Sequence, residues 1–165
     1  MSKFEIREEI PVKSFSIAAF IYRMVGGKSE YLIIKRSSET LFGSWQMVSG
    51  KVEKNETGIS ATLREIEEET GLVPTKLYSA DLIESFYDTD YNVINLVPVF
   101  VALVDSDSEV KLNEYEHSEY KWISVDEASE YLIFENQIEN MEKIEKKFVK
   151  KTVNPFLEIE LKNYI

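Results

Sequence analysis

The chain has 165 residues, 44% of them hydrophobic, which is enough to bury one core, so we expect a single domain over residues 1–165. Thirty acidic and nineteen basic side chains give a net charge of -11, which repels nucleic-acid backbones and anionic membranes and argues against both as partners. The chain has no cysteine, so any metal must be held by oxygen atoms or by His117, the one histidine.

The amino-terminal stretch "MSKFEIREEIPVK" is charged throughout and has no apolar segment of signal-peptide length. The longest apolar run, residues 93–104, is too short to span a bilayer. We therefore expect a soluble, cytoplasmic protein. The sequence leaves its oligomeric state open, a homodimer included.

The first half of the chain predicts strands followed by one helix. β-Branched and aromatic residues predict strands over residues 13–25 and 31–37, and a short strand ends at Gly50. Beyond it the apolar period lengthens to about 3.6 residues, which indicates a helix. Thr57 is a suitable N-cap for this helix and Gly71 a suitable C-cap.

The second half predicts three more strands, over residues 76–87, 92–104 and 117–124. Pro98 suggests an edge position or a bulge in the second of these strands. Ser124 and Glu127 form a capping-box pattern that opens a short helix, and a longer helix is expected over residues 135–151. The predicted fold class is therefore α/β, with helices flanking a mixed sheet.

The helix after Gly50 carries four glutamates within residues 65–69. At about 100° per residue its apolar residues share one narrow arc, which we expect to be buried: Ile59, Leu63, Ile66 and Thr70. Three carboxylates are expected to point the opposite way and to converge, those of Glu65, Glu68 and Glu69. Glu67 falls outside this group.

Two interpretations of the acidic helix stay open at this point. One is a solvated face, which is common in acidic proteins. The other is a site for a hard divalent cation such as Mg²⁺, which prefers oxygen ligands and would relieve the repulsion among carboxylates at this spacing. Arg64 is the one local cation and can pair with Glu68, while the preceding loop adds Glu53 and Glu56.

The spacing of these residues resembles the Nudix box at every defined position. The pattern consists of Gly50, Glu56, Arg64-Glu65, the apolar Ile66, Glu68-Glu69, Gly71 and the apolar Leu72. One departure is that many members have two glycines where this chain has Ser49-Gly50. The order of predicted strands and helices also resembles the Nudix α/β/α sandwich over nearly the whole chain.

The resemblance implies a hydrolase that cuts within the pyrophosphate of a nucleoside diphosphate linked to another group. It implies that Mg²⁺, with Mn²⁺ as a substitute, is held by carboxylates and one backbone carbonyl: those of Glu65, Glu68, Glu69 and Ser49. Arg64 would orient this cluster together with Glu56, and Glu53 would support the ligands from the loop. The expected partner is a phosphorylated small molecule.

Nudix enzymes often take one more carboxylate from a later loop. Residues 113–122 offer three, and Glu116 is favoured over Glu114 and Glu119 as the catalytic base or a further ligand. The string "EHSEYKW" resembles one found in dihydroneopterin triphosphate and diadenosine polyphosphate hydrolases, and "WQMVSGKVEKNET" resembles the former group. His117 is expected to be structural.

Candidate substrate contacts lie outside the box. Lys35 and Arg36 end a predicted strand and point to opposite faces, so either could bind phosphate. Trp45 and the aromatic residues Phe86, Tyr87 and Tyr91 could stack on a purine or pterin ring. For each aromatic side chain alone, core packing is the competing explanation.

Three functions are compatible with the residues. The leading expectation is a Mg²⁺-dependent pyrophosphohydrolase that cleaves a nucleoside or pterin triphosphate to the monophosphate and pyrophosphate. A second keeps the chemistry but takes diadenosine polyphosphates. A third is a non-catalytic Nudix-fold nucleotide sensor, although such domains commonly lose box carboxylates that this chain retains.

Overall fold

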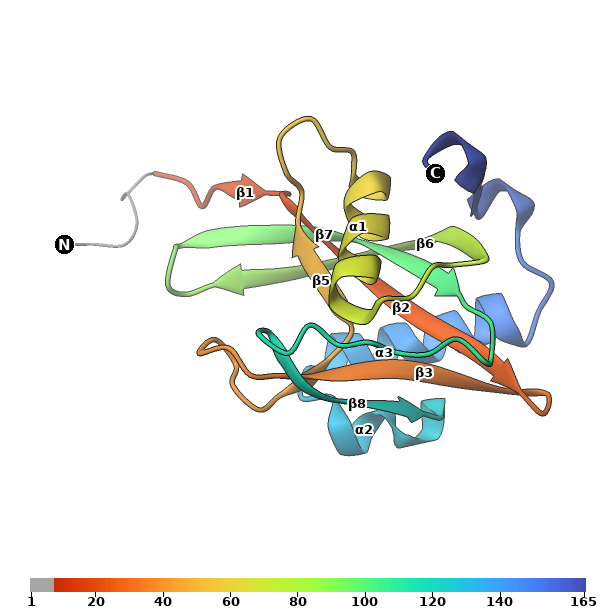
Figure 1. Cartoon of the computed structure of the whole chain (residues 1–165). Coiled ribbons are helices and arrows are strands. Elements are labelled where there is room, and N and C mark those ends of the chain that lie inside the picture. Colours follow the sequence, from red (N-terminus) through yellow and green to blue (C-terminus); the bar gives the residue numbers. More distant parts are fainter. Residues whose placement is uncertain (1–7) are drawn as a thin grey trace.

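A nine-stranded sheet lies between helices on its two faces in the computed structural model, which describes residues 8–165 (Figure 1). The strands are β1 Val12–Lys13, β2 Ser16–Val25, β3 Lys28–Arg36, β4 Trp45–Gln46, β5 Val48–Lys51, β6 Lys76–Asp88, β7 Val93–Leu103, β8 His117–Ile123 and β9 Glu158–Ile159. The helices are α1 Gly58–Thr70, α2 Ala128–Tyr131 and α3 Glu135–Ile144, with a π-helical turn η2 Glu145–Val149 and three 3₁₀ turns, η1 Val125–Glu127, η3 Pro155–Leu157 and η4 Leu161–Asn163.

The sheet is mixed, as predicted. Its main strand order is β4-β3-β2-β7-β6-β9, with β8 beside β3, β5 beside β2 and β1 beside β7. The pairs β2–β7 and β1–β7 are parallel, whereas the other pairs are antiparallel. The strands expected from the sequence are all present within the described residues.

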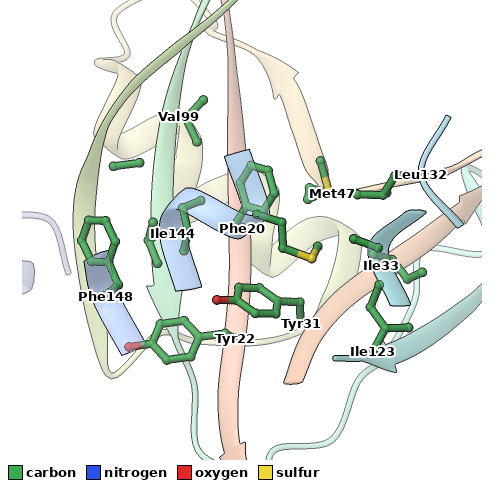
Figure 2. Close-up of a cluster of buried hydrophobic side chains, with 14 of the residues drawn as sticks. Phe20, Tyr22, Tyr31, Ile33, Met47, Val99, Ile123, Leu132, Ile144 and Phe148 are labelled. Atoms are coloured by element: carbon green, nitrogen blue, oxygen red, sulfur yellow. The ribbon is translucent and has the colours of Figure 1, made fainter. Parts of the chain in front are cut away.

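Two hydrophobic cores fill the space between the sheet and its helices. One lies on the α1 side, where Ile66 and Ala61 pack against β2 and β3. The other lies beneath α2 and α3, where Phe20, Ile33, Ile144 and others pack together (Figure 2). Because both faces of β2 are covered, its residues 17–22 are all buried. The architecture is therefore the expected α/β/α sandwich.

Pro98 does not mark an edge strand, because β7 has partners on both sides. Pro98 pairs with Ile83 of β6, and the irregular register lies in β6, between Ser79 and Ile83. On the other side of β7, the pairing with β1 stops at Asn95 and the pairing with β2 begins at Val99. The missing N–H of Pro98 therefore falls where one ladder is interrupted, so the proline is tolerated in the interior of the sheet.

The predicted helix over residues 135–151 is present but ends in the π-helical turn η2. The first residue of η2, Glu145, is buried and accepts hydrogen bonds from the hydroxyls of Ser29 and Tyr31, each at 2.7 Å. Burial, together with the bond to Glu145, raises the pKa of Tyr31, and burial raises the pKa of Tyr22 to about 12. Within residues 8–165, none of the helices has the length and apolar content needed to cross a membrane.

The caps of α1 agree with the prediction. The hydroxyl of the N-cap Thr57 accepts from the backbone N–H of Ser60 at 3.1 Å, and the Ser60 hydroxyl accepts from the N–H of Thr57 at 2.8 Å. At the other end Gly71 has φ 69°, and its N–H donates to Glu67 at 2.8 Å. Ile66 and Thr70 are buried as expected, whereas Ile59 and Leu63 are partly buried against the same core.

Replacing the N-cap should destabilise the protein. Thr57→Ala removes the acceptor for the Ser60 N–H, and we expect the free energy of unfolding to fall by about 1 kcal/mol. Thr57→Ser keeps the hydroxyl and should stay close to the wild type. Urea denaturation measures both, and a Thr57→Ala protein as stable as the wild type would contradict the assignment of this cap.

Candidate metal and catalytic site

The guanidinium of Arg64 joins the loop before α1 to the acidic face of the helix. It forms a bidentate pair with Glu56, with Nε–Oε1 at 2.6 Å and Nη2–Oε2 at 3.0 Å. Its Nη1 donates to Glu65 at 2.8 Å and to Glu68 at 3.2 Å, and its Nη2 donates to the carbonyl of Lys51 at 2.9 Å. One cation therefore offsets the repulsion among three carboxylates.

The same pairing fixes the loop. Hydrogen bonds from Arg64 lower the pKa of Glu56 to about 2, so this carboxylate stays ionised. The Glu53 backbone N–H also donates to Glu56, at 2.9 Å. The Glu53 carboxylate itself is mostly exposed and lies 4.0 Å from Arg64, at the edge of the cluster.

Gly50 lies in contact with Glu65. A Cβ at position 50 would overlap the Glu65 carboxylate and lie 2.6 Å from its Cγ. Gly50 itself pairs with Ile17 of β2, so the strand cannot move away without breaking its ladder. Glycine is therefore needed at position 50, because only a residue without a Cβ lets the strand approach the Glu65 side chain this closely. Ser49 is the residue that precedes this contact.

Of the three carboxylates predicted to point away from the buried side, only that of Glu68 lies on the solvent face, which corrects the prediction; the side chain of Glu65 is 13% exposed. The side chain of Glu68 is 58% exposed, whereas that of Glu69 is 5% exposed. The segment before β8 covers this end of α1, because the Lys111 and Asn113 N–H groups donate to the carbonyls of Thr70 and Glu69, respectively. That contact depends on residues more than forty positions later and could not be read from helical periodicity.

Glu69 meets Glu116 and His117 under this segment. One ligand atom from each of the three residues lies within 4.8 Å of the others. The His117 Nε2 is 3.5 Å from Glu69 Oε1, and neither ring nitrogen forms a hydrogen bond in the described structure, nor does Glu69 Oε2. Burial raises the pKa values of Glu69 and Glu65. The sequence predicts His117 as a structural residue, whereas the structure brings it into this group; its position directly after Glu116 is the signal that points there.

The arrangement fits a hard divalent cation. The cluster offers the carboxylates of Glu69 and Glu116 beside those of Glu65 and Glu68, and carboxylates are the ligands that such ions prefer. The unpartnered Oε2 of Glu69 is a buried acceptor that a cation would satisfy. A positive ion would also favour the ionised forms of Glu65 and Glu69, which burial disfavours.

Of the two predicted basic contacts, Arg36 lies on the α1 side of the sheet. Its positive charge acts on the Glu69 carboxylate. Its guanidinium also donates to three groups of the adjoining loop and β4: the Thr40 carbonyl, the Ser38 hydroxyl and the Gln46 side chain. Arg36 therefore orders the loop that follows β3, whatever else it binds.

Lys35 and Trp45 belong to the opposite face. Lys35 pairs with Glu119 at 3.2 Å and lies 5.7 Å from the ring centroid of Trp45. Trp45 packs edge-on against Tyr131 at 5.9 Å, in the core beneath α2 and α3. The structure therefore does not bring these two side chains to the acidic cluster.

Tyr87 lies near the end of β6 and is half exposed, as are Phe86 and Tyr91. Its hydroxyl donates to the Asn92 side chain at 2.8 Å, within the hairpin that joins β6 to β7. The three aromatic residues thus form part of that hairpin rather than of the acidic cluster.

Comparison with known proteins gives the family. The model of the NUDIX domain matches residues 14–151, which include the whole acidic cluster. The chain belongs to the Nudix family. The expected resemblance is therefore confirmed, and Nudix enzymes generally use divalent metal ions.

Three proteins of known name are similar over most of this chain. An octanoyltransferase of Myxococcus xanthus is 33% identical over 136 residues, 81% of this chain but 36% of that protein, so this chain spans about a third of its length. The asymmetrical bis(5'-nucleosyl)-tetraphosphatase of Rattus norvegicus is 30% identical over 111 residues, 64% of this chain and 71% of that one. The Escherichia coli dihydroneopterin triphosphate pyrophosphohydrolase shares the fold, with TM-score 0.65 and 23% identity over 86% of this chain and 97% of that one.

Adding a methyl group at Gly50 should displace Glu65. We expect Gly50→Ala to lower metal-dependent turnover by about 10²-fold, because displacing a reacting group by about 1 Å costs that much. Gly58→Ala is the matched control, since a Cβ there meets its neighbours at 3.6 Å or more, an ordinary contact. Equal turnover of the two variants, measured by release of the nucleotide product, would contradict the role of this contact.

The Glu56–Arg64 pair should stabilise the protein in a pH-dependent way. The pKa of Glu56 falls from 4.5 to about 2 in the folded state, so its contribution is present above pH 4.5 and is lost as the pH falls toward 2. We expect the stability difference between the wild type and Glu56→Gln to be constant above about pH 5 and to shrink below it.

Urea unfolding between pH 3 and 7 measures this difference. Glu67→Gln is the control, because Glu67 is exposed and has no ion pair in the described structure. A Glu56→Gln difference that stays flat down to pH 3 would argue against the ion pair.

Proposed function

We propose that this chain is a Mg²⁺-dependent pyrophosphohydrolase that cleaves a nucleoside or pterin triphosphate to the monophosphate and pyrophosphate. The observation that carries this proposal is the cluster formed by Glu69 and Glu116, with a buried unpartnered oxygen, beside the Arg64-bound carboxylates of α1. A solvated acidic face would not bury Glu69 or leave its oxygen without a partner.

The metal ligands proposed are Glu65, Glu68, Glu69 and the carbonyl of Ser49, with Mn²⁺ as a substitute for Mg²⁺. When bound, the cation would neutralise charge on the phosphates and lower the pKa of a bound water. Arg64 holds Glu65 and Glu68 in place by hydrogen bonds of 2.8 and 3.2 Å.

Glu116 is the proposed base. Its backbone is fixed, because its carbonyl accepts from the Ser37 N–H at 2.9 Å and its N–H donates to the Asn113 carbonyl at 3.1 Å. Glu116 is an exposed residue, and one of its carboxylate oxygens lies within 4.8 Å of ligand atoms of Glu69 and His117. A Glu116 carboxylate oxygen can therefore take the proton of a water that attacks phosphorus in line with the leaving pyrophosphate.

Arg36 is the best placed of the predicted phosphate contacts, because it lies on the α1 side and its charge reaches Glu69. Lys35 and Trp45 are proposed substrate contacts from the sequence, but their partners on the opposite face argue against a direct role. Tyr87 is exposed, and we retain it as a candidate for stacking on a base.

A cytoplasmic location and a homodimer also remain predictions.

A second candidate substrate is a diadenosine polyphosphate. The relative in Rattus norvegicus, a bis(5'-nucleosyl)-tetraphosphatase, favours it at 30% identity. The E. coli pyrophosphohydrolase is a likeness of fold, so the preference for a triphosphate rests on the strings around Trp45 and Glu116. A nucleotide sensor without catalysis is disfavoured, because Glu65, Glu68 and Glu69 are all retained.

Glu68→Gln tests the catalytic proposal. Glu68 is 58% exposed, so the change should leave the fold intact while removing a ligand charge. We expect turnover to fall by at least about 10²-fold with Mg²⁺ or Mn²⁺, since even partners behind the metal ligands contribute up to that amount. Glu67→Gln, on the adjacent exposed residue, should keep wild-type turnover. Wild-type rates in the Glu68→Gln protein would refute the proposal.

A substrate panel with product analysis separates the candidates. Dihydroneopterin triphosphate and dATP should yield pyrophosphate and a monophosphate under the leading proposal. Diadenosine tetraphosphate would instead yield ATP and AMP, or two molecules of ADP. Binding of nucleotide without turnover in either metal would favour the sensor.

A further inference from the structure

A break in the register of β8 directs His117 toward α1. Lys35 pairs with Glu119, but the next residue, Arg36, pairs with His117, so Ser118 is skipped. Without this irregularity Arg36 would face Ser118, and His117 would turn to the other side of the sheet. Irregularities of this kind commonly re-aim a side chain next to an active site.

The imidazole is therefore enclosed beside the acidic cluster. His117 is 3% exposed, and its backbone N–H is held by the Asn113 carbonyl at 3.0 Å. Its Nε2 lies 3.5 Å from Glu69 Oε1, yet the ring nitrogens and Glu69 Oε2 have no hydrogen-bond partner in the described structure. Buried polar atoms rarely lack a hydrogen-bond partner. We therefore expect these atoms to bind a ligand, or the imidazole and the Glu69 carboxylate to move slightly closer together.

We propose that His117 is a positioning residue that donates from Nε2 to Oε1 of Glu69 and thereby turns Oε2 toward the divalent cation. The inference rests on the proposed role of Glu69 as a metal ligand. The sequence alone predicts only that His117 is structural.

Positioning is favoured over direct ligation by the chemistry of the groups present. Imidazole suits Zn²⁺, Cu²⁺ and Ni²⁺, whereas carboxylates suit Mg²⁺ and Mn²⁺, and Glu69 and Glu116 supply carboxylates at this point. A partner behind a ligand fixes its orientation, and loss of such a partner typically weakens metal binding by about 10–100-fold.

Mn²⁺ binding to the full chain, measured by titration calorimetry, tests the inference. His117→Phe keeps the ring volume but removes the donor, and we expect Mn²⁺ affinity to fall by about 10–100-fold. His117→Gln places an amide nitrogen near the position of Nε2, and we expect it to recover most of the lost affinity. Ser118→Ala, on the exposed neighbour, should bind as the wild type does.

The outcomes are distinguishable. Wild-type affinity in a folded His117→Phe protein, or equal loss in the Phe and Gln variants, would overturn the inference. Glu69→Gln separates it from the proposed function: unchanged Mn²⁺ binding in that variant would remove Glu69 from the metal site altogether. If His117→Phe does not fold, His117→Asn, whose amide is too short to reach Glu69, takes its place.

Electron spin-echo measurements on the Mn²⁺-loaded wild type need no variant. A positioning histidine leaves the metal without a directly bonded nitrogen, so we expect no strong ¹⁴N modulation. Clear modulation from a coordinated ¹⁴N would make His117 a ligand and overturn the inference.

Discussion

The site depends on one cation placed among like charges. Without Arg64, the carboxylates of Glu56, Glu65 and Glu68 would repel one another across the junction of loop and helix. The guanidinium binds all three and also the Lys51 carbonyl, so it links β5 to α1 through contacts of 2.6 to 3.2 Å. Its planar geometry suits this task, because lysine could not present several donors in fixed directions. The helix can thus carry high negative charge without leaving the sheet.

The other parts of the site around Arg64 come from segments that are distant in sequence. Gly50 lets β5 approach Glu65, and the segment before β8 lies over the end of α1 and buries Glu69. The result is a cluster that is exposed at Glu68 and closed at Glu69. A site of this form can admit solvent and phosphate on one side while keeping a low dielectric on the other, where electrostatic interactions are stronger.

The sequence predicted what depends on local pattern. Thr57 and Gly71 correctly marked the two ends of α1, because caps act within one helical turn. The spacing of the Nudix box indicated the acidic cluster on this helix. The burial of Glu69 and the inward turn of His117 were not predicted, and of the two positions suggested for Pro98 the edge was wrong, since each depends on strand register or on a distant segment. Alternation predicted that Lys35 and Arg36 face opposite ways, but only the packing of α1 decides which face belongs to the site.

The two hydrophobic cores lie on opposite faces of the sheet. The core beneath α2 and α3 is built around large apolar side chains such as Phe20, Ile144 and Phe148 (Figure 2). The core on the α1 side lies next to Glu65 and Glu69, whose ionised forms burial disfavours. A cation bound at these carboxylates would favour their ionised forms, so binding of the ion and stability of the fold would be linked on this side of the sheet. The resistance of the protein to unfolding would then rise with the concentration of free divalent cation.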